Sequence, residues 1–177
     1  MVHHPVMEMR VEPDAVLVVA GVPGAGKTTL IDRAVDRAAT TVVDTDDRRR
    51  EGRASRYKPV RVAGHYRRIV AAILLRRGAP VVVHSRGTTT LARRAFPLLA
   101  RVRGRPAHLV LLTVSTEAAL AGQRQRGRII PGREMRGHIE RFGAVVADPE
   151  RLARREGWAS VTVLDRERAS ALARIGA

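Results

Sequence analysis

The chain has 177 residues and no cysteine, so it contains neither disulfide bonds nor thiolate metal sites. Its formal net charge is +16, which is compatible with binding to a polyanion. No apolar run approaches the length that spans a bilayer, and the first residues lack the order of a secretory signal, so we expect a cytoplasmic protein with no membrane partner.

The positive charge has a simpler explanation than nucleic-acid binding. Lys27 and Lys58 are the only lysines among the 33 basic residues, and the chain contains no asparagine. A GC-rich genome produces such a bias toward arginine without selection for binding. We therefore favour a solvated basic surface over a nucleic-acid interface, and nucleic acid stays open as a partner.

The first part of the chain leads into a phosphate-binding motif. Residues 1–14 show no clear periodicity, so we expect an irregular arm before a single domain that spans 15–177. The apolar run 15–20 (AVLVVA) predicts a buried parallel strand. The following segment from Gly21 to Thr28 (GVPGAGKT) matches the phosphate-loop pattern G-x-x-x-x-G-K-[ST]. Helical spacing then predicts a helix that includes Leu30, Ile31, Ala34, Val35 and Ala38.

This motif predicts the binding of a nucleoside triphosphate. Its glycines let backbone N–H groups surround phosphate oxygens at the positive end of a helix. Lys27 is expected to reach the β- and γ-phosphates and to act in catalysis, and Thr28 is expected to bind Mg²⁺. The expected nucleotide contacts of this segment are Gly21, Gly24, Ala25, Gly26, Lys27, Thr28 and Thr29.

A second strand, Thr41–Asp44, ends in a cluster of carboxylates at 44–47. Residues 48–63 are basic and interrupted by glycine and proline, which predicts a mobile loop or a short helical excursion. A helix is expected over His65–Arg77, with one face made of Ile69, Val70, Ile73 and Leu74.

Two further strands flank another helix. Val81–His84 is the third apolar strand, and the loop 85–90 (SRGTTT) follows it. Leu109–Val114 is the fourth strand. The helix between them, which Pro97 is expected to kink, has an apolar face made of Leu91, Ala95, Leu98, Leu99 and Val102.

The rest of the chain continues the alternation of helix and strand. Ser115 is a candidate cap for a helix that runs from Thr116 toward Arg126, and a basic segment broken by glycine and proline follows it. Asp148-Pro149 predicts the start of a helix that Gly157 ends. The other expected elements are helices at 133–142 and 168–175 and a fifth strand at 161–164.

Apolar strands that alternate with helices predict an α/β fold with a five-stranded parallel sheet and helices on both faces. In such a three-layer fold the ligand lies beyond the carboxyl ends of the strands. We therefore expect the phosphate loop, the carboxylates at 44–47, the segment 84–88 and Asp165 to meet at one edge.

Charged groups at this edge suit phosphoryl transfer, which needs a group to orient the acceptor hydroxyl, a metal ion and cations that neutralise the moving phosphoryl group. Residues 44–49 (DTDDRR) offer carboxylates and arginines at one strand end. Arg124, Arg126 and Arg128 are candidates for a mobile lid that closes over the triphosphate, and at least one of them is expected to be catalytic.

At these motifs the chain resembles the polynucleotide-kinase-like and zeta-toxin-like P-loop kinases, a group that includes chloramphenicol phosphotransferases and many small proteins labelled AAA-family ATPases. The likeness covers roughly residues 15–170. It rests on GVPGAGKTT, on DTDDRR, on RQRGR at 124–128 and on EGWASVTVLD at 156–165. The resemblance implies a nucleoside-kinase-like P-loop NTPase fold with an arginine lid at about 124–133, and it implies ATP and Mg²⁺ as cofactors.

The resemblance also implies roles for individual residues. Asp46 would accept the proton of the acceptor hydroxyl, and Arg49 would contact the substrate or the reacting phosphoryl group. Arg124 and Arg126 would be the lid arginines, and the turn at Asp165-Arg166 would lie near the adenine.

One segment departs from the family. An acidic residue usually follows the third strand, whereas this chain has His84-Ser85-Arg86-Gly87-Thr88. Mg²⁺ would then depend on Thr28, on water and on Asp44 or Asp46. His84 is either a polar substrate contact or a strand-end histidine that bonds to the backbone.

Other nucleotide-dependent machines fit less well. A chain without asparagine has no Asn-Lys-x-Asp motif of a GTPase, and the Ser-Gly-Gly-Gln signature of transporter ATPases is absent from the sequence. A motor ATPase usually needs more chain and an acidic pair after the third strand. We expect an ATP-dependent kinase that phosphorylates a hydroxyl of a small molecule or a polynucleotide 5′ end. The alternative is a nucleotide-binding regulatory ATPase module with little transfer activity.

Overall fold

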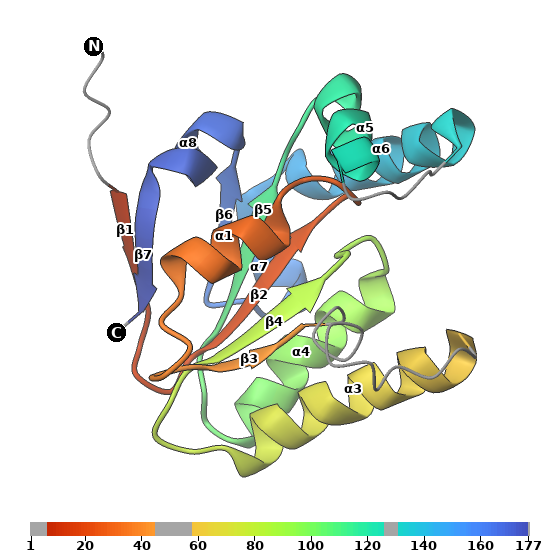
Figure 1. Cartoon of the computed structure of the whole chain (residues 1–177). Coiled ribbons are helices and arrows are strands. Elements are labelled where there is room, and N and C mark those ends of the chain that lie inside the picture. The colour runs from red at the N-terminus through yellow and green to blue at the C-terminus, as the bar shows by residue number, and fades with distance from the viewer. Residues whose placement is uncertain (1–6, 45–57, 126–130, 177) are drawn as a thin grey trace.

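A computed structural model describes residues 7–44, 58–125 and 131–176, and its centre is a parallel β-sheet (Figure 1). The strands follow the order β3-β4-β2-β5-β6, and every neighbouring pair is parallel. The expected α/β fold with a five-stranded parallel sheet is confirmed. The strand bounds are β2 (Val16–Gly21), β3 (Thr41–Val43), β4 (Val81–Ser85), β5 (Ala107–Leu112) and β6 (Ser160–Leu164).

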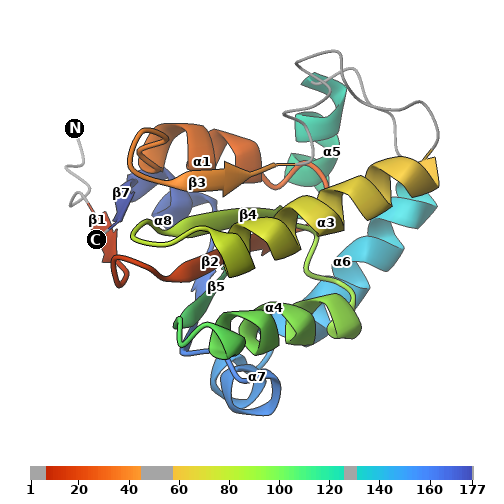
Figure 2. The ribbon, with the colours of Figure 1, turned by 90° about the horizontal axis from the view of Figure 1, so that it is seen from below.

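Helices cover both faces of the sheet because its strands are apolar on both sides. In β2, Val16, Val18 and Ala20 pack toward one face, whereas Leu17 and Val19 pack toward the other. Residues of α3, α4 and α6 cover the first face and residues of α1 cover the second, as Figure 2 shows for α1, α3 and α4. The helix bounds are α1 (Lys27–Ala34), α3 (Lys58–Leu75), α4 (Thr90–Val102), α5 (Thr116–Gln125), α6 (Gly132–Val146), α7 (Pro149–Glu156) and α8 (Arg166–Ala171).

Two short strands at the ends of the chain correct two expectations. Met7–Arg10 forms β1 instead of part of an irregular arm, and it pairs in parallel with β7 (Leu172–Gly176). The helix expected at 168–175 therefore stops as α8 at Ala171. Leu172 and Ile175 are buried in the cluster that contains the apolar residues of α1. This long-range packing overrides the local helical pattern.

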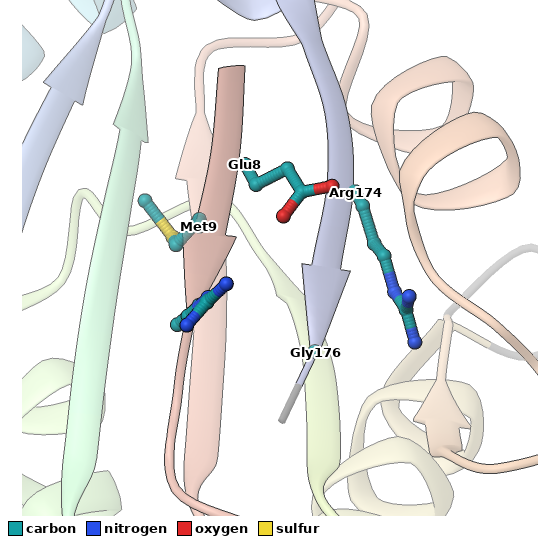
Figure 3. A pocket seen from close by; sticks show the side chains of 5 residues that line it. Glu8, Met9, Arg174 and Gly176 are labelled. Atoms are coloured by element: carbon teal, nitrogen blue, oxygen red, sulfur yellow. The ribbon is translucent and has the colours of Figure 1, made fainter. Parts of the chain in front are cut away.

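A small pocket adjoins the strands β1 and β7 (Figure 3). The end of β1 lies near the start of β2, because only residues 11–15 separate the two strands. The N–H of Val11 donates to the carbonyl of Gly176 at 3.0 Å, so the end of β7 lies there too. The pocket is therefore at the amino-terminal end of the central sheet. The pocket is therefore remote from the phosphate loop, which follows the carboxyl end of β2. Its lining consists of Glu8, Met9, Arg10, Arg174 and Gly176.

The first helix is shorter than expected. It ends at Ala34, and Val35 adopts an extended backbone with φ of −107° and forms a parallel bridge with Ile175. Arg33, in the last helical turn, donates to the carbonyl of Leu172 at 3.3 Å. Pairing with β7 thus ends α1 before Ala38, although the apolar periodicity continues.

The other helices largely follow the expectations. Helix α3 is an exception, since it begins at Lys58 instead of His65 and ends at Leu75 instead of Arg77. The preceding segment 45–57 lies outside the described residues. Ser115 accepts the N–H of Ala118 at 3.2 Å, which confirms it as a cap of α5. In α7 the expected start at Asp148-Pro149 and the end at Gly157 are confirmed. Within 7–44, 58–125 and 131–176, no helix is long and apolar enough to cross a membrane.

Helix α4 turns a different face to the core from the one expected. Its buried residues include Phe96, Pro97 and Ala100, together with Arg93. The helix carries two apolar stripes, and local periodicity does not decide which of them is buried. The expected core residues that are exposed instead are Leu91, Leu98 and Val102.

Arg93 is buried because it pairs with Glu156 of α7. Its Nε and Nη2 donate to the carboxylate oxygens at 2.8 to 3.2 Å, and the indole N–H of Trp158 donates to the same carboxylate at 3.1 Å. Nη1 of Arg93 donates to the carbonyl of Gly87 at 2.6 Å. Gly87 has φ of +70°, and a Cβ there would lie 2.5 Å from the Cβ of Ala20. The pair therefore holds the loop after β4 against the last residues of β2.

Arg105 fastens the opposite end of the sheet. Its guanidinium donates to the carbonyls of Ile73 and Arg76 in and after α3 at 3.0 Å each, and to that of Ala79 at 2.9 Å. Nε donates to the carbonyl of Asp14, just before β2, at 2.5 Å. One buried arginine thus satisfies carbonyls at the end of a helix and links them to the start of the central strand.

We expect Glu156→Ala to lower the free energy of unfolding by about 3–5 kcal/mol, because it leaves the Arg93 guanidinium buried without its carboxylate. Urea unfolding monitored by circular dichroism measures the effect. Glu150→Ala in the same helix is the matched control, since the Glu150–Arg154 pair is exposed and should contribute less than about 1 kcal/mol. An equal effect of the two substitutions would contradict the structural role of Arg93–Glu156.

Candidate functional site

The phosphate loop joins β2 to α1 at the carboxyl edge of the sheet (Figure 1). Gly24 in this loop has φ of +87°, and a Cβ at this position would lie 2.2 Å from the carbonyl oxygen of Ala119 in α5. Only glycine fits both the backbone conformation and this close approach. Helix α5 therefore supports the loop from behind and fixes its shape.

Lys27, the first residue of α1, is buried, and its ammonium group lies over the loop. Nζ donates to the carbonyls of Gly21 and Val22 at 2.8 and 3.0 Å. A positive charge is thus held at the helix N-terminus, where backbone N–H groups already favour anions. The arrangement suits the phosphates of a nucleotide.

Thr28 provides the test of whether this site fits Mg²⁺. The residue is 3% exposed, and its Oγ1 has no hydrogen-bond partner in the described part of the chain. A buried hydroxyl is normally hydrogen-bonded, so an oxygen left without a partner at this position fits a hard cation that takes oxygen ligands. Within the described ranges no group of three or more His, Asp or Glu side chains could hold a metal alone. Any ion here would need phosphate or water oxygens as well.

Asp44 lies at the end of β3 and is fully buried. The parallel pairing of Val43 with Val83 places it beside His84, and the His84 Nδ1 lies 2.5 Å from the Asp44 Oδ1. Nη1 of Arg68 in α3 donates to the backbone carbonyl of Asp44 at 3.4 Å. His84 therefore contacts a carboxylate side chain, which neither of the two alternatives for it anticipated.

His65 of α3 joins this cluster. Burial lowers its pKa, electrostatic interaction with His84 and Arg68 lowers it further, and the Asp44 carboxylate opposes them. His65 is therefore neutral at pH 7. Sequence reasoning missed both His65 and Arg68. Their only signal is a spacing of three residues beside the apolar face of α3.

The sheet topology sets how far these groups lie from the loop. Because β4 separates β3 from β2, Asp44 stands two strand spacings, or roughly 10 Å, from the phosphate loop. His84 lies between them, since it pairs with Val19 of β2. Lys27, Thr28, Asp44 and His84 thus share one edge of the sheet.

Several expected site residues fall outside the described residues: Asp46, Arg49, Arg126 and Arg128. Arg124 is described and lies exposed near the end of α5. The preceding Gln123 is buried, and its Oε1 has no partner among the described residues. Sequence reasoning gave Gln123 no role, because a glutamine carries no motif at this position.

The remaining expected contacts lie at the same edge or are solvent-exposed. Asp165 follows β6 and caps α8 by accepting the N–H of Arg168 at 2.8 Å. Arg166 is exposed at the start of that helix. Thr29 is exposed, whereas Gly24, Ala25 and Gly26 of the loop are partly exposed. Among the described residues, no hydrogen bond or ion pair joins the Arg166 side chain to the phosphate loop.

Comparison with known proteins identifies the family. A family model described as an AAA domain matches residues 16–149. A search of curated proteins finds no match. This span contains the phosphate loop, β3, β4 and α5, which are the elements that build the site.

Solved structures with the same fold include P-loop kinases. A protein of the PezAT toxin–antitoxin system of Streptococcus pneumoniae is 16% identical with a TM-score of 0.64, and the match covers 91% of this chain and 71% of that one. A gluconokinase from Sinorhizobium meliloti is 18% identical with a TM-score of 0.56, over 90% and 89% of the two chains. A chain of an RNA repair complex is 18% identical with a TM-score of 0.57, over 76% and 45%.

At such low identities these likenesses show the fold alone. The family match, in contrast, covers more than half of the chain and includes the phosphate loop. The expected resemblance to the P-loop kinase group is thereby confirmed. The chain belongs to the AAA-domain family and has the fold of the P-loop kinases.

Proposed function

We propose that the chain is an ATP-dependent kinase that transfers the γ-phosphoryl group of ATP to a hydroxyl group. The observation that carries the proposal is the buried Thr28 hydroxyl, which has no partner among the described residues and follows Lys27 at the start of α1. A structural threonine would normally bond to a neighbouring backbone group. A threonine that binds Mg²⁺ keeps this oxygen for the ion.

The loop and the start of α1 would bind the phosphates of ATP. Lys27 would exchange its bonds with the Gly21 and Val22 carbonyls for bonds with the β- and γ-phosphates. Thr28 and water would hold Mg²⁺, together with Asp46 or, through bridging water, Asp44 on the second strand away. When bound, the ion would neutralise charge on the phosphate oxygens. Backbone N–H groups of Gly24, Ala25 and Gly26 would contact the phosphates, and Arg166 would lie near the adenine.

In the transfer, the acceptor oxygen would form a bond to the γ-phosphorus as the bond from this phosphorus to the bridging oxygen of ADP breaks. Asp46 would take the proton of the acceptor hydroxyl, and Arg49 would bind the acceptor or the moving phosphoryl group. Arg124, Arg126 and Arg128 would stabilise the charge that develops on that group, with one or more of them closing over the site.

The Asp44–His84 pair would take the structural place of the acid that is missing after β4. An acid at the end of β4 would lie next to the phosphate loop, whereas here β4 supplies His84 and the carboxylate comes from the adjacent strand β3. The histidine fixes the orientation of that carboxylate, as outer partners do for metal ligands.

A regulatory ATPase module with little transfer activity is the second candidate. Ser85 and not an acid ends β4, and this specific feature favours weak chemistry at the γ-phosphate. Such a module would bind ATP through the same loop. The two candidates differ in the role of Asp46, which would act as the general base in a kinase but not in a regulatory module.

We expect Thr28→Val to raise the Mg²⁺ concentration needed for ATP to stabilise the protein, by on the order of tenfold or more, because the substitution removes a ligand oxygen and keeps the shape of the side chain. Thermal unfolding with ATP over a Mg²⁺ series measures this. Without ligand the variant should be as stable as wild type, since no internal hydrogen bond of the described chain is lost. Thr40→Val is the control, and an unchanged Mg²⁺ dependence would rule out Thr28 as a ligand.

Asp46→Asn tests the chemistry and separates the two candidate functions. A kinase should still bind ATP yet lose phosphoryl transfer by on the order of 10²–10⁴-fold, because the general base is gone. The assay is transfer from labelled ATP to a panel of hydroxyl acceptors, with ATP binding measured by calorimetry. Lys27→Ala should lose ATP binding itself, and Asp32→Asn should change neither property. Slow ATP hydrolysis that is unaltered in Asp46→Asn would contradict the assigned base and favour the regulatory module.

The acceptor class can be read from salt dependence. We expect a small-molecule acceptor, because compositional bias is enough to explain the basic surface. For such an acceptor the KM should change little between about 50 and 200 mM salt. If the protein instead contacts several phosphates of a polynucleotide acceptor, its affinity for that acceptor should fall by on the order of 10³-fold or more over this range. Steady-state kinetics with each class of acceptor makes the measurement.

A further inference from the structure

Helix α4 has an exposed apolar stripe that the proposed kinase site does not use. Leu91, Leu98 and Val102 are 80%, 61% and 70% exposed, and they belong to the helix whose opposite face carries Phe96 and Ala100 into the core. Ala95 completes the stripe between Leu91 and Leu98. We call these four residues, Leu91, Ala95, Leu98 and Val102, the α4 stripe.

The α4 stripe has the spacing of a helix-packing seam. Its members are separated by four, three and four residues, so they follow the apolar positions of a heptad. A short pattern begins at Leu91 and recurs at Leu98. It consists of a leucine, two further residues, an arginine and then a small or branched apolar residue. The stripe extends over roughly 16 Å of helix axis at 1.5 Å per residue.

Arginines border the stripe in the same register. Arg94 and Arg101 are both exposed and lie three residues after Leu91 and Leu98, respectively. Neither makes an ion pair with a carboxylate within 7–44, 58–125 and 131–176. Between Glu51 and Glu117 the sequence contains no acidic residue, so neither α3 nor β4 nor α4 supplies a carboxylate that could neutralise them.

The charges beside the α4 stripe indicate which kind of partner could bind to it. A second copy of the chain in antiparallel pairing would bring Arg94 and Arg101 against the same two arginines, and like charges at flanking positions oppose pairing. In parallel pairing it would offer them only Ala92 and Leu99, so neither arrangement supplies a carboxylate. An anionic membrane surface would favour bulky aromatic residues on the apolar face, but the α4 stripe holds only leucine, alanine and valine. Heptad spacing with arginine borders matches a helix that has its own apolar seam and acidic flanks.

We propose that the α4 stripe is a docking site for an amphipathic helix of a partner protein, with apolar residues at heptad spacing and Asp or Glu at the flanking positions. This interaction is independent of the proposed kinase activity. The apolar side chains supply the buried contact, and the pairing of carboxylates with Arg94 and Arg101 sets the register and the choice of partner.

A synthetic peptide of about three heptads tests the proposal. It carries leucines at the four–three spacing and glutamates at the flanking positions, and a second peptide replaces the glutamates with lysines. Fluorescence anisotropy with the full chain should show binding of the glutamate peptide and much weaker binding of the lysine peptide. Leu98→Glu should weaken the glutamate peptide by on the order of tenfold or more, because it places a charge in the seam.

Two matched controls separate the stripe from general effects. Leu75→Glu changes another exposed leucine, on α3, and should leave binding unchanged. Arg94→Glu with Arg101→Glu should reverse the preference and favour the lysine peptide, whereas Arg136→Glu on α6 should not. Circular dichroism of each variant verifies that it is folded.

Several results would overturn the proposal. One such result is equal binding of the glutamate peptide to wild type and to Leu98→Glu. Another is the absence of binding of this peptide to wild type. A dimer in analytical ultracentrifugation that Leu98→Glu abolishes would assign the stripe to a second copy instead. Binding to phosphatidylcholine vesicles with about one third phosphatidylserine, lost in Leu98→Glu but not in Leu75→Glu, would assign it to a membrane surface.

Discussion

The parallel pairing of β2 with β4 on one side and β5 on the other is the constraint on which the rest of the structure depends. Residues 16–20 of β2 are completely buried, so the strand must be covered on both faces as well as paired along both edges. Parallel pairing brings the carboxyl ends of all five strands to one edge. Because the phosphate loop follows β2, it lies at the centre of that edge, with polar strand ends on either side.

Two buried arginines hold the elements around this central strand. Arg105 links the start of β2 to the end of α3. Arg93 links the loop after β4 to Glu156, whose carboxylate also accepts the indole N–H of Trp158 just before β6. Both satisfy backbone carbonyls that would otherwise be buried without donors. The EGW motif of the sequence therefore has a structural meaning, since Glu156 fixes Arg93 and through it the loop that faces the phosphate loop.

The sequence predicted the central sheet well because most of its strands contain short continuous apolar runs, the pattern expected of parallel strands that are buried on both faces. It failed where long-range pairing decides local structure. Val35 leaves α1 to pair with Ile175, and residues 7–10 become a strand only because β7 lies beside them. In α4 the burial of Arg93 was not predicted. An arginine is buried only when a partner such as Glu156 pairs with it, and this partner is distant in sequence.

The candidate site shows the same division between local and long-range information. The phosphate loop is a local motif whose backbone conformation and residue types are coupled, so the sequence alone identified it. The partner of His84 is not local, because the contact with Asp44 arises from the pairing of β3 with β4. A missing acid after β4 reads as a deficiency in the sequence, but in the fold an adjacent strand supplies a carboxylate that a histidine orients. We therefore propose that the acidic group at this edge comes from a neighbouring strand and not from the usual motif position after β4.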